Sequence, residues 1–267
     1  MDFNLQESAE EFLELASEQR LSILNILSDK KARLTEIAKT LDSTKPEIHR
    51  NLQRLENSEI ITKDVDGFYF LTTYGLSLCT LMPSITFISK NKQYFRNHNF
   101  GSLPLKFIHR VGELSNGKMI TGFSRTLDHW KQIFENSQKF IYGILVEEPS
   151  SLIEPLIKKG KKGIKINSLF SESAIVPETR KQVIKKLSIQ KLITSGILQR
   201  RMKKDLNVMV ILNEQEACVS FPNSSGETDI SKMFYGSNFE FHEWCLDFFR
   251  YCWHNSRTFD ENKLLKQ

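Results

Sequence analysis

Two neighbouring segments near the N-terminus repeat their apolar residues with the period of a helix. In the first segment the apolar residues recur every three or four positions, as Leu34, Ile37, Ala38 and Leu41. In the second segment they are Ile48, Leu52 and Leu55. Because the polar residues 42–44 lie between the two segments, residues 34–56 are predicted to form two short helices joined by a tight turn.

The second of these helices has a predicted start signal and two contrasting faces. Thr44 with Glu47 three residues later predicts a capping box, and Pro46 suits a first turn, where no N–H is needed. The face opposite the apolar stripe carries long basic and amide side chains: Lys45, His49, Arg50, Gln53 and Arg54. This combination is typical of a helix that enters the major groove of DNA. The alternative is an ordinary helical hairpin with a solvated polar face.

The segments on either side favour the first interpretation. Residues 20–27 form an apolar run that predicts a helix packed behind the pair. Downstream, residues 60–63 and 68–72 predict two strands joined by a turn at residues 64–67. A β-hairpin in this place would be a wing, and Lys63 would lie near a DNA phosphate.

Residues 8–75 thus resemble the winged-helix domain of archaeal transcriptional regulators in the arsenic-repressor-like (ArsR-like) group. The family pattern usually has a glycine after the recognition helix, where this chain has Ser58 and Glu59. Double-stranded DNA is therefore the predicted partner. The residues expected to bind it are Thr44, Lys45, Glu47, His49, Arg50, Gln53, Arg54 and Lys63.

After the predicted wing, residues 73–75 lead into a helical stretch that is predicted to continue to about residue 97. Its apolar positions alternate by three and four, as Leu78, Leu81, Ile85 and Ile88, and they predict a seam for a partner helix. Pro83 is expected to kink this helix or to end its first half. Helix-turn-helix proteins usually read two half-sites with two-fold symmetry, so the seam favours a homodimer. Packing against the chain's own domain is the alternative.

The second half of the chain predicts a sheet covered by helices. A strand, a helix and a second strand form a βαβ unit, which implies parallel strands. The predicted elements are a helix over 105–114, a turn at 116–117, a strand at 118–122, a helix over 125–136, the βαβ unit of 139–146, 150–159 and 164–170, a helix over 178–188, a strand pair at 207–212 and 217–221, and an aromatic helix over 239–254.

This half is similar to the sheet of phospholipase-D-like domains, on the segment Gly163-Ile-Lys-Ile166 and the strand and helix before it. It is also similar to the effector domain of archaeal winged-helix regulators of the methanogenesis-regulator type. The predicted fold class is therefore α+β, with a degenerate phospholipase-D-like C-terminal domain. The predicted divisions are a winged-helix domain at 1–75, linker and dimerisation helices at 76–115, and an α/β effector-sensing domain at 116–260.

Composition narrows the class of protein. The 267 residues are 40% hydrophobic and 10% aromatic, as in globular proteins, and the net charge of +5 permits nucleic-acid binding. The acidic, amphipathic N-terminus does not look like a signal peptide, and no apolar run is long enough to span a bilayer, so a cytoplasmic location is expected. The four cysteines show no C-x-x-C pairing and the six histidines are scattered, so neither a metal site nor a cofactor is predicted.

Phospholipase-D-like catalysis needs a histidine, a lysine two residues on and an aspartate at H-x-K-x-x-x-x-D spacing. One segment comes close, with His129 and Lys131, but Asn136 stands where the aspartate would be. The family uses two such motifs, and this one falls inside a predicted helix. No catalytic residues, and no enzyme, are therefore predicted.

A crevice at the carboxyl ends of the parallel strands could still hold a ligand. Several basic residues could line it and favour an anionic or phosphorylated effector: Arg180, Lys181, Arg200, Arg201, Lys203 and Lys204. Trp244 is the first candidate for an aromatic pocket wall, with core packing as the alternative. The basic run Lys158–Lys165 is interpreted as an exposed turn whose two glycines serve backbone geometry, or else as a non-specific DNA contact.

The leading hypothesis is a dimeric, DNA-binding transcriptional regulator whose second domain senses a small molecule through a shift between two arrangements. Two alternatives belong to other classes. The first is a phosphodiesterase-like enzyme that uses a winged helix to dock on nucleic acid. The second is a winged-helix adaptor whose recognition face meets another protein.

Overall fold

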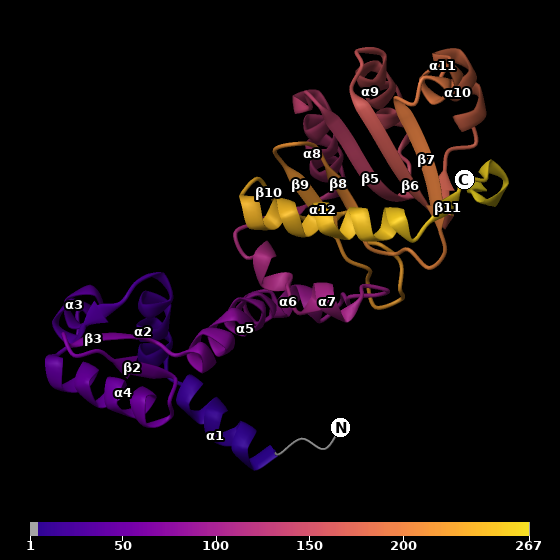
Figure 1. Cartoon of the computed structure of the whole chain (residues 1–267). Coiled ribbons are helices and arrows are strands. Elements are labelled where there is room, and N and C mark those ends of the chain that lie inside the picture. The colour runs from indigo at the N-terminus through magenta and orange to yellow at the C-terminus, as the bar shows by residue number, and fades with distance from the viewer. Residues whose placement is uncertain (1–4, 267) are drawn as a thin grey trace. The chain divides into compact units, whose positions relative to one another are not determined.

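The computed structural model describes residues 5–266, including all of their side chains except those of residues 5–8 and 11. It divides into two compact units, of which the first ends at Pro83 and the second begins at Ser84 (Figure 1). The second unit thus starts well upstream of residue 116, where the sequence suggested the second domain would begin.

The first unit is a small helical domain with a three-stranded sheet in the order β1-β3-β2. Its elements are α1 (Leu5–Leu15), α2 (Glu18–Asp29), β1 (Ala32–Arg33), α3 (Leu34–Thr40), α4 (Lys45–Asn57), β2 (Ile61–Lys63), β3 (Phe68–Leu71) and the start of α5 (Thr73–Lys90). The predicted helix pair and the antiparallel wing hairpin are confirmed. The short strand β1, which pairs with β3, was not predicted.

The apolar positions of the helix pair form the centre of the first unit's core. Ile37, Ile48, Leu52 and Leu55 are completely buried, together with Leu24 of α2. Helical spacing places these side chains on one face of each helix, and burying that face is the main source of stability for helices this short. The predicted apolar stripes are therefore confirmed.

The start of α4 differs from the prediction in one respect. Pro46 does lie in the first turn, but the side chain of Thr44 accepts no capping hydrogen bond, so the predicted capping box with Glu47 is wrong. A capping side chain accepts from the second or third N–H of its helix. Because Pro46 occupies the second position and has no N–H, one of these two donors is missing.

Pro83 does not end the helix that contains it. Helix α5 runs without interruption from Thr73 to Lys90, with Pro83 inside it. A proline in a helix interior removes one hydrogen bond, a cost that packing on both sides can offset. Cys79 before it is buried in the core of the first unit, and Phe87 after it is buried in the core of the second.

The second unit contains a mixed nine-stranded sheet in the order β11-β7-β6-β5-β8-β9-β10-β4, with β12 beside β6. Its elements are the end of α5, α6 (Lys92–Phe95), α7 (Leu105–Ile108), the 3₁₀ helix η1 (Val111–Leu114), β4 (Lys118–Thr121), α8 (Phe123–Asn136), β5 (Phe140–Glu147), α9 (Ser150–Lys161), β6 (Lys165–Val176), α10 (Arg180–Leu187), α11 (Gln190–Thr194), β7 (Leu198–Lys203), β8 (Met209–Leu212), β9 (Ala217–Ser220), β10 (Lys232–Gly236), α12 (Phe239–His254), β11 (Arg257–Thr258), η2 (Glu261–Lys263) and β12 (Leu265–Lys266).

The predicted βαβ unit is confirmed, since β5 and β6 are parallel and β7 continues the parallel set. Strand β7 was not predicted, because its sequence from Leu198 to Lys203 contains Arg200 and Arg201 and was interpreted only as a source of basic side chains. The single helix expected over 105–114 is instead the two short helices α7 and η1.

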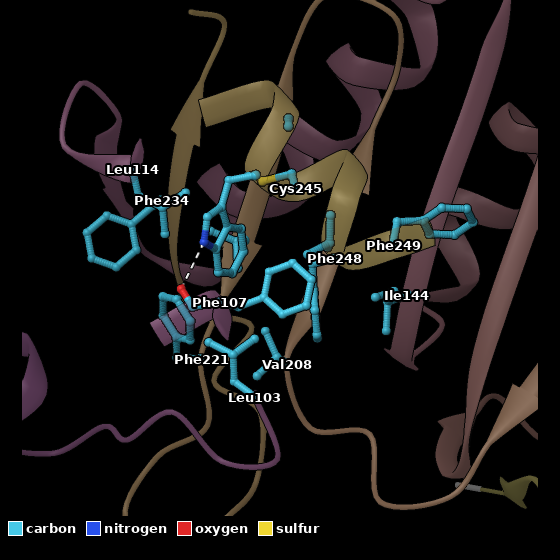
Figure 2. Close-up of a cluster of buried hydrophobic side chains, with 14 of the residues drawn as sticks. Leu103, Phe107, Leu114, Ile144, Val208, Phe221, Phe234, Cys245, Phe248 and Phe249 are labelled. Atoms are coloured by element: carbon cyan, nitrogen blue, oxygen red, sulfur yellow. Dashed lines mark hydrogen bonds between the residues drawn. The ribbon is translucent and has the colours of Figure 1, made fainter. Parts of the chain in front are cut away.

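Helices cover both faces of the sheet. Helices α8, α9 and α11 contribute buried side chains to one core cluster, and the segment from Phe87 to Leu114 joins α12 in the other. Figure 2 shows Phe107, Phe221 and Phe248 in this second cluster. Residues 84–114 are therefore part of the core of the second unit.

Candidate nucleic-acid interface

The turn between α3 and α4 depends on a backbone conformation that suits its sequence. Asp42 has φ +48°, in the left-handed region, which aspartate tolerates better than most residues do. The Ser43 N–H then donates to the Ala38 carbonyl at 3.0 Å and closes the end of α3. This closure sets where α4 begins.

A glutamine from α2 connects this turn to α4. Gln19 donates from Nε2 to the Ser43 hydroxyl at 3.1 Å, and its Oε1 accepts from Asn51 Nδ2 at 2.5 Å. Asn51 also donates to the Glu47 carbonyl within α4 at 3.1 Å. These bonds hold α4 at a fixed angle to α2. Gln19 and Asn51 carried no signal in the sequence, because they are 32 residues apart and only the fold brings them together.

The predicted recognition face of α4 is exposed over most of its length. Thr44, Lys45, His49, Arg50 and Gln53 are exposed and Glu47 is half-buried. Within the described part of the chain, neither Lys45 nor Arg50 has a carboxylate oxygen within 4.0 Å. The arrangement is a rigid helix with a row of donor side chains free to meet phosphates or base edges.

Arg54 differs from the rest of this face because α1 neutralises it. Its Nε and NH2 groups donate to the two carboxylate oxygens of Glu14, at 3.1 and 2.5 Å. The hydrogen bond to Glu14 is the largest of the effects that raise the pKa of Arg54. Arg20 in turn holds the end of α1, donating to the carbonyls of Glu14 and Leu13 at 2.6 and 2.8 Å. Arg54 would have to leave Glu14 before it could meet a phosphate.

The wing turns tightly around an acidic residue. Asp64 accepts from the backbone N–H groups of Phe68 at 2.8 Å and Asp66 at 3.0 Å, and Gly67 supplies the positive φ of +83°. These bonds, that from Phe68 above all, lower the pKa of Asp64, and Lys31 adds an ion pair at 3.2 Å. Lys63 is exposed beside the turn, as expected for a phosphate contact.

Two of the three arginines suggested for an effector site, Arg180 and Arg200, are neutralised by carboxylates of their own unit. Arg180 is 3% exposed and forms ion pairs with Glu148 and Glu261, and Arg200 reaches Glu261 at 3.3 Å. Burial opposes the charge of Arg180, but the two carboxylates outweigh it and its pKa is raised. For Arg200 burial dominates and the pKa is lowered. Arg201 donates to the Ser256 carbonyl at 3.1 Å on the other face of the sheet.

Trp244 belongs to the core of the second unit. Its side chain is completely buried, and its indole N–H donates to the Phe107 carbonyl at 3.1 Å, the bond drawn as a dashed line in Figure 2. The suggested aromatic pocket wall is therefore wrong, and the alternative of core packing holds. Bulky rings spaced by three and four on α12 bury against the sheet because they all lie on one helix face.

The H-x-K segment lies on α8, as predicted, and the helix separates its members. His129 contacts the Tyr235 ring at 5.0 Å between centroids, whereas Lys131 pairs with Glu135 at 3.7 Å on the exposed side. Residues two apart on a helix point about 200° apart, so the two side chains cannot meet one phosphate. Asn136 donates to Glu216 at 2.8 Å.

A groove of about 750 Å³ lies between α8 and α9, lined by apolar side chains such as Leu127 and Phe134 and by charged ones such as Lys131 and Glu154.

The described residues contain no group of three or more histidine, cysteine or acidic side chains placed to bind a metal ion. All four cysteines are buried and unpaired, and burial raises the pKa of Cys218 and Cys252 to about 12. In the same part of the chain, no helix has the length and apolar character that crossing a membrane requires.

Comparison with known proteins supports the assignment of the first unit. Residues 17–63 match the family described as bacterial regulatory protein, arsR family. No curated protein sequence matches the chain.

Solved structures resemble the chain at low identity. TrmBL2, an archaeal chromatin protein with a novel mode of DNA binding, is 12% identical over 91% of this chain and 94% of its own, with a TM-score of 0.41. The quinone-bound YodB from B. subtilis is 25% identical over 34% of this chain and 99% of its own, with a TM-score of 0.30. NucT from Helicobacter pylori is 11% identical over 54% of this chain and 98% of its own, with a TM-score of 0.42.

Proposed function

We propose that this protein, which carries an ArsR-family helix-turn-helix domain at residues 17–63, is a transcriptional regulator that reads double-stranded DNA with α4. The observation that carries the proposal is the face of Lys45, His49, Arg50 and Gln53, which is exposed on a helix whose opposite face is completely buried. The bonds through Gln19 tie the backbone of α4 to α2, so the helix itself is already ordered before it binds.

Substitution of Arg50 and Gln53 tests DNA reading. Arg50→Ala with Gln53→Ala should weaken binding to a promoter fragment by about a hundredfold or more, because each good base contact is worth about 1–3 kcal/mol. The thermal unfolding midpoint should not change, since both side chains are exposed. Arg54 is left in place, because its removal would also free Glu14.

The matched control is Lys118→Ala with Gln199→Ala, two exposed positions of the second unit. This control variant should bind the promoter fragment with the same affinity and the same salt dependence as the unchanged protein. Equal binding by the two double variants would refute the role of α4. Binding of a protein partner by the unchanged chain but not by the Arg50 variant, with no DNA binding by either, would favour an adaptor.

The regulator is proposed to be a homodimer that joins through α5. Leu81, Ile85 and Ile88 of the predicted seam are 54%, 59% and 37% exposed, which is unusual for three apolar side chains on one helix face. A second copy of α5 could cover them, and two-fold pairing would place two copies of α4 for two half-sites.

Charge placed in this seam tests the dimer. Leu81→Asp with Ile85→Asp should convert the protein to a monomer in sedimentation velocity, because two facing pairs of carboxylates would have to be buried. Leu105→Asp is the control, since Leu105 is 69% exposed on a different element. A monomeric unchanged protein, or a dimer that survives the double change, would refute the seam.

The second unit is proposed to bind a small molecule and to lack enzymatic activity. The groove between α8 and α9 is of a size that holds ligands, whereas Arg180 and Arg200 are paired with carboxylates. The H-x-K segment does not favour phosphodiester hydrolysis, because its two side chains lie on different sides of α8. Native mass spectrometry of the purified chain, repeated with Leu127→Trp to fill the groove, should show a bound molecule only in the unchanged protein.

A further inference from the structure

Exposed lysines gather over three helices on one side of the second unit. Helices α9, α10 and α11 lie next to each other on the same side of the sheet (Figure 1). We call the exposed lysines of this region the lysine surface: Lys158, Lys161, Lys162, Lys165, Lys181, Lys185, Lys186 and Lys191. They come from two segments, residues 158–165 and 181–191, and most of strand β6 lies between these segments in the chain.

Direct packing brings the two segments together. Gly160 near the end of α9 lies so close to Leu192 of α11 that a Cβ at this glycine would be 2.9 Å from the Leu192 Cδ1 atom. This glycine therefore serves the contact between helices, whereas only Gly163, with φ +88°, serves the turn. The contact places the end of α9 beside Lys191.

The strand order brings the remaining lysines to the same region. Parallel strands β5, β6 and β7 begin at one edge of the sheet, as the pairs Phe140–Lys165 and Ile166–Leu198 show. Helix α9 ends at this edge, and α10 and α11 return to it, because each connects the end of one strand to the start of the next. Lysines of both segments lie near enough to Glu154 to lower its pKa. Lys158 of α9 has the largest effect, and Lys186 of α10 has a smaller one.

The positive charge of this surface is hardly compensated. Lys158 pairs with Glu154 at 2.9 Å, and for the other seven lysines no carboxylate oxygen of the described residues lies within 4.0 Å. Arg180, Arg200 and Arg257 of the same unit are all paired with glutamates. The eight lysines also exceed the net charge of +5 of the whole chain, so the remainder of the protein is on balance negative.

We propose that the lysine surface is a second contact for double-stranded DNA, one that binds the phosphate backbone without regard to sequence. Lysine is a flexible, hydrated point charge, suited to phosphates at no fixed geometry, whereas base recognition favours arginine, asparagine or glutamine. The surface has no exposed aromatic side chain among its described residues, which single-strand binding would use for stacking. This inference rests on the proposed function, which supplies the DNA.

The two contacts would act on one polymer. Once α4 holds a duplex, the lysine surface meets DNA at a high effective concentration, so a weak contact adds measurably to affinity. Each phosphate that it neutralises adds about 0.9 to the slope of log affinity against log salt.

Removing four of these charges in the full-length protein tests the proposal. Lys161→Gln, Lys162→Gln, Lys185→Gln and Lys186→Gln together should weaken binding to a 40-base-pair duplex of arbitrary sequence by about tenfold at 0.1 M salt, and should lower the salt slope by about two or more. Binding to a specific promoter fragment should weaken by a similar factor, because the lysine contact does not depend on sequence.

The matched control carries the same charge change at exposed lysines elsewhere in the chain: Lys90→Gln, Lys92→Gln, Lys118→Gln and Lys204→Gln. Equal binding by the two quadruple variants would overturn the proposal, since net charge alone would then explain any loss. Circular dichroism of both variants checks that the fold is kept.

The Arg50→Ala and Gln53→Ala variant separates this proposal from the proposed function. If both hold, that variant keeps weak, salt-sensitive binding to any duplex, and the four lysine changes abolish what is left. If the lysine surface binds DNA and α4 does not, the α4 change has no effect while the lysine changes do. Loss of all binding in the α4 variant would leave the lysine surface without a role and would overturn the proposal.

Discussion

Arg50 of the first unit and Arg180 of the second are used in opposite ways. On α4 of the first unit, Arg50 is exposed, and the whole predicted face comes from one continuous segment of thirteen residues. In the second unit Arg180 is buried, and its partners Glu148 and Glu261 lie 32 and 81 residues away. A basic residue is a candidate for ligand binding only when the fold leaves it without an internal carboxylate, and sequence spacing reveals this only for local partners.

Removing Arg180 should have the largest effect. Arg180→Ala leaves two carboxylates of a largely buried cluster without their shared partner, which should cost about 3 kcal/mol of unfolding free energy. Urea unfolding of the full chain measures this loss. The control is Lys181→Ala at the exposed neighbouring position, which should change the unfolding free energy by less than about 0.5 kcal/mol. A stable Arg180→Ala protein would mean that the arginine is available to a ligand after all, and the contrast between the units would fail.

A change in the backbone of the first unit should have an intermediate effect. Glu59 follows α4 with φ +56°, at the place where the family pattern usually has glycine. Glu59→Gly should stabilise the first unit by about 0.5–1 kcal/mol, because glycine adopts this region without a steric cost. Amide hydrogen exchange in α4 measures this change in the stability of the first unit. Glu56→Gly, inside the last turn of α4, should instead destabilise by about 1 kcal/mol. The same sign for both changes would show that the left-handed conformation is not the cause.

The smallest effect concerns the long-range ion pair of the recognition helix. Glu14→Gln should raise DNA affinity a few-fold and steepen the salt slope by about one, because Arg54 no longer has to leave a carboxylate before meeting a phosphate. Glu10→Gln removes the same charge from an exposed position of α1 and serves as the control. If the two variants bind alike, Arg54 does not contact DNA, and the reading face of α4 ends at Gln53.

The sequence predicted the first unit closely because its signals are local. Ile48, Leu52 and Leu55 identify the buried face of α4 by spacing alone, and the Asp64–Gly67 turn identifies the wing. The failed capping box is also local: the side chain of Thr44 accepts no hydrogen bond from α4, although the third helical residue, Glu47, has an N–H to donate.

The second unit was predicted in outline only. The β5–α9–β6 unit was visible in its apolar runs, but β7 was not, because its sequence contains the charged residues Arg200 and Arg201, which are half-buried. A strand in the interior of a sheet is defined by its neighbours on both sides, and β7 has β6 on one side and β11 on the other. Those neighbours are supplied by other parts of the chain.

The sequence by itself determined the periods of the helices, the two faces of α4 and the position of the wing, because these follow from bonds between residues a few positions apart. Tertiary structure alone decided which charges are free. It paired Arg54 with Glu14, neutralised Arg180 and Arg200, fixed α4 through Gln19, and joined two runs of lysines into one surface. The reason is physical: the energy of a charge depends on burial and on its nearest opposite charges, and both are properties of the folded chain.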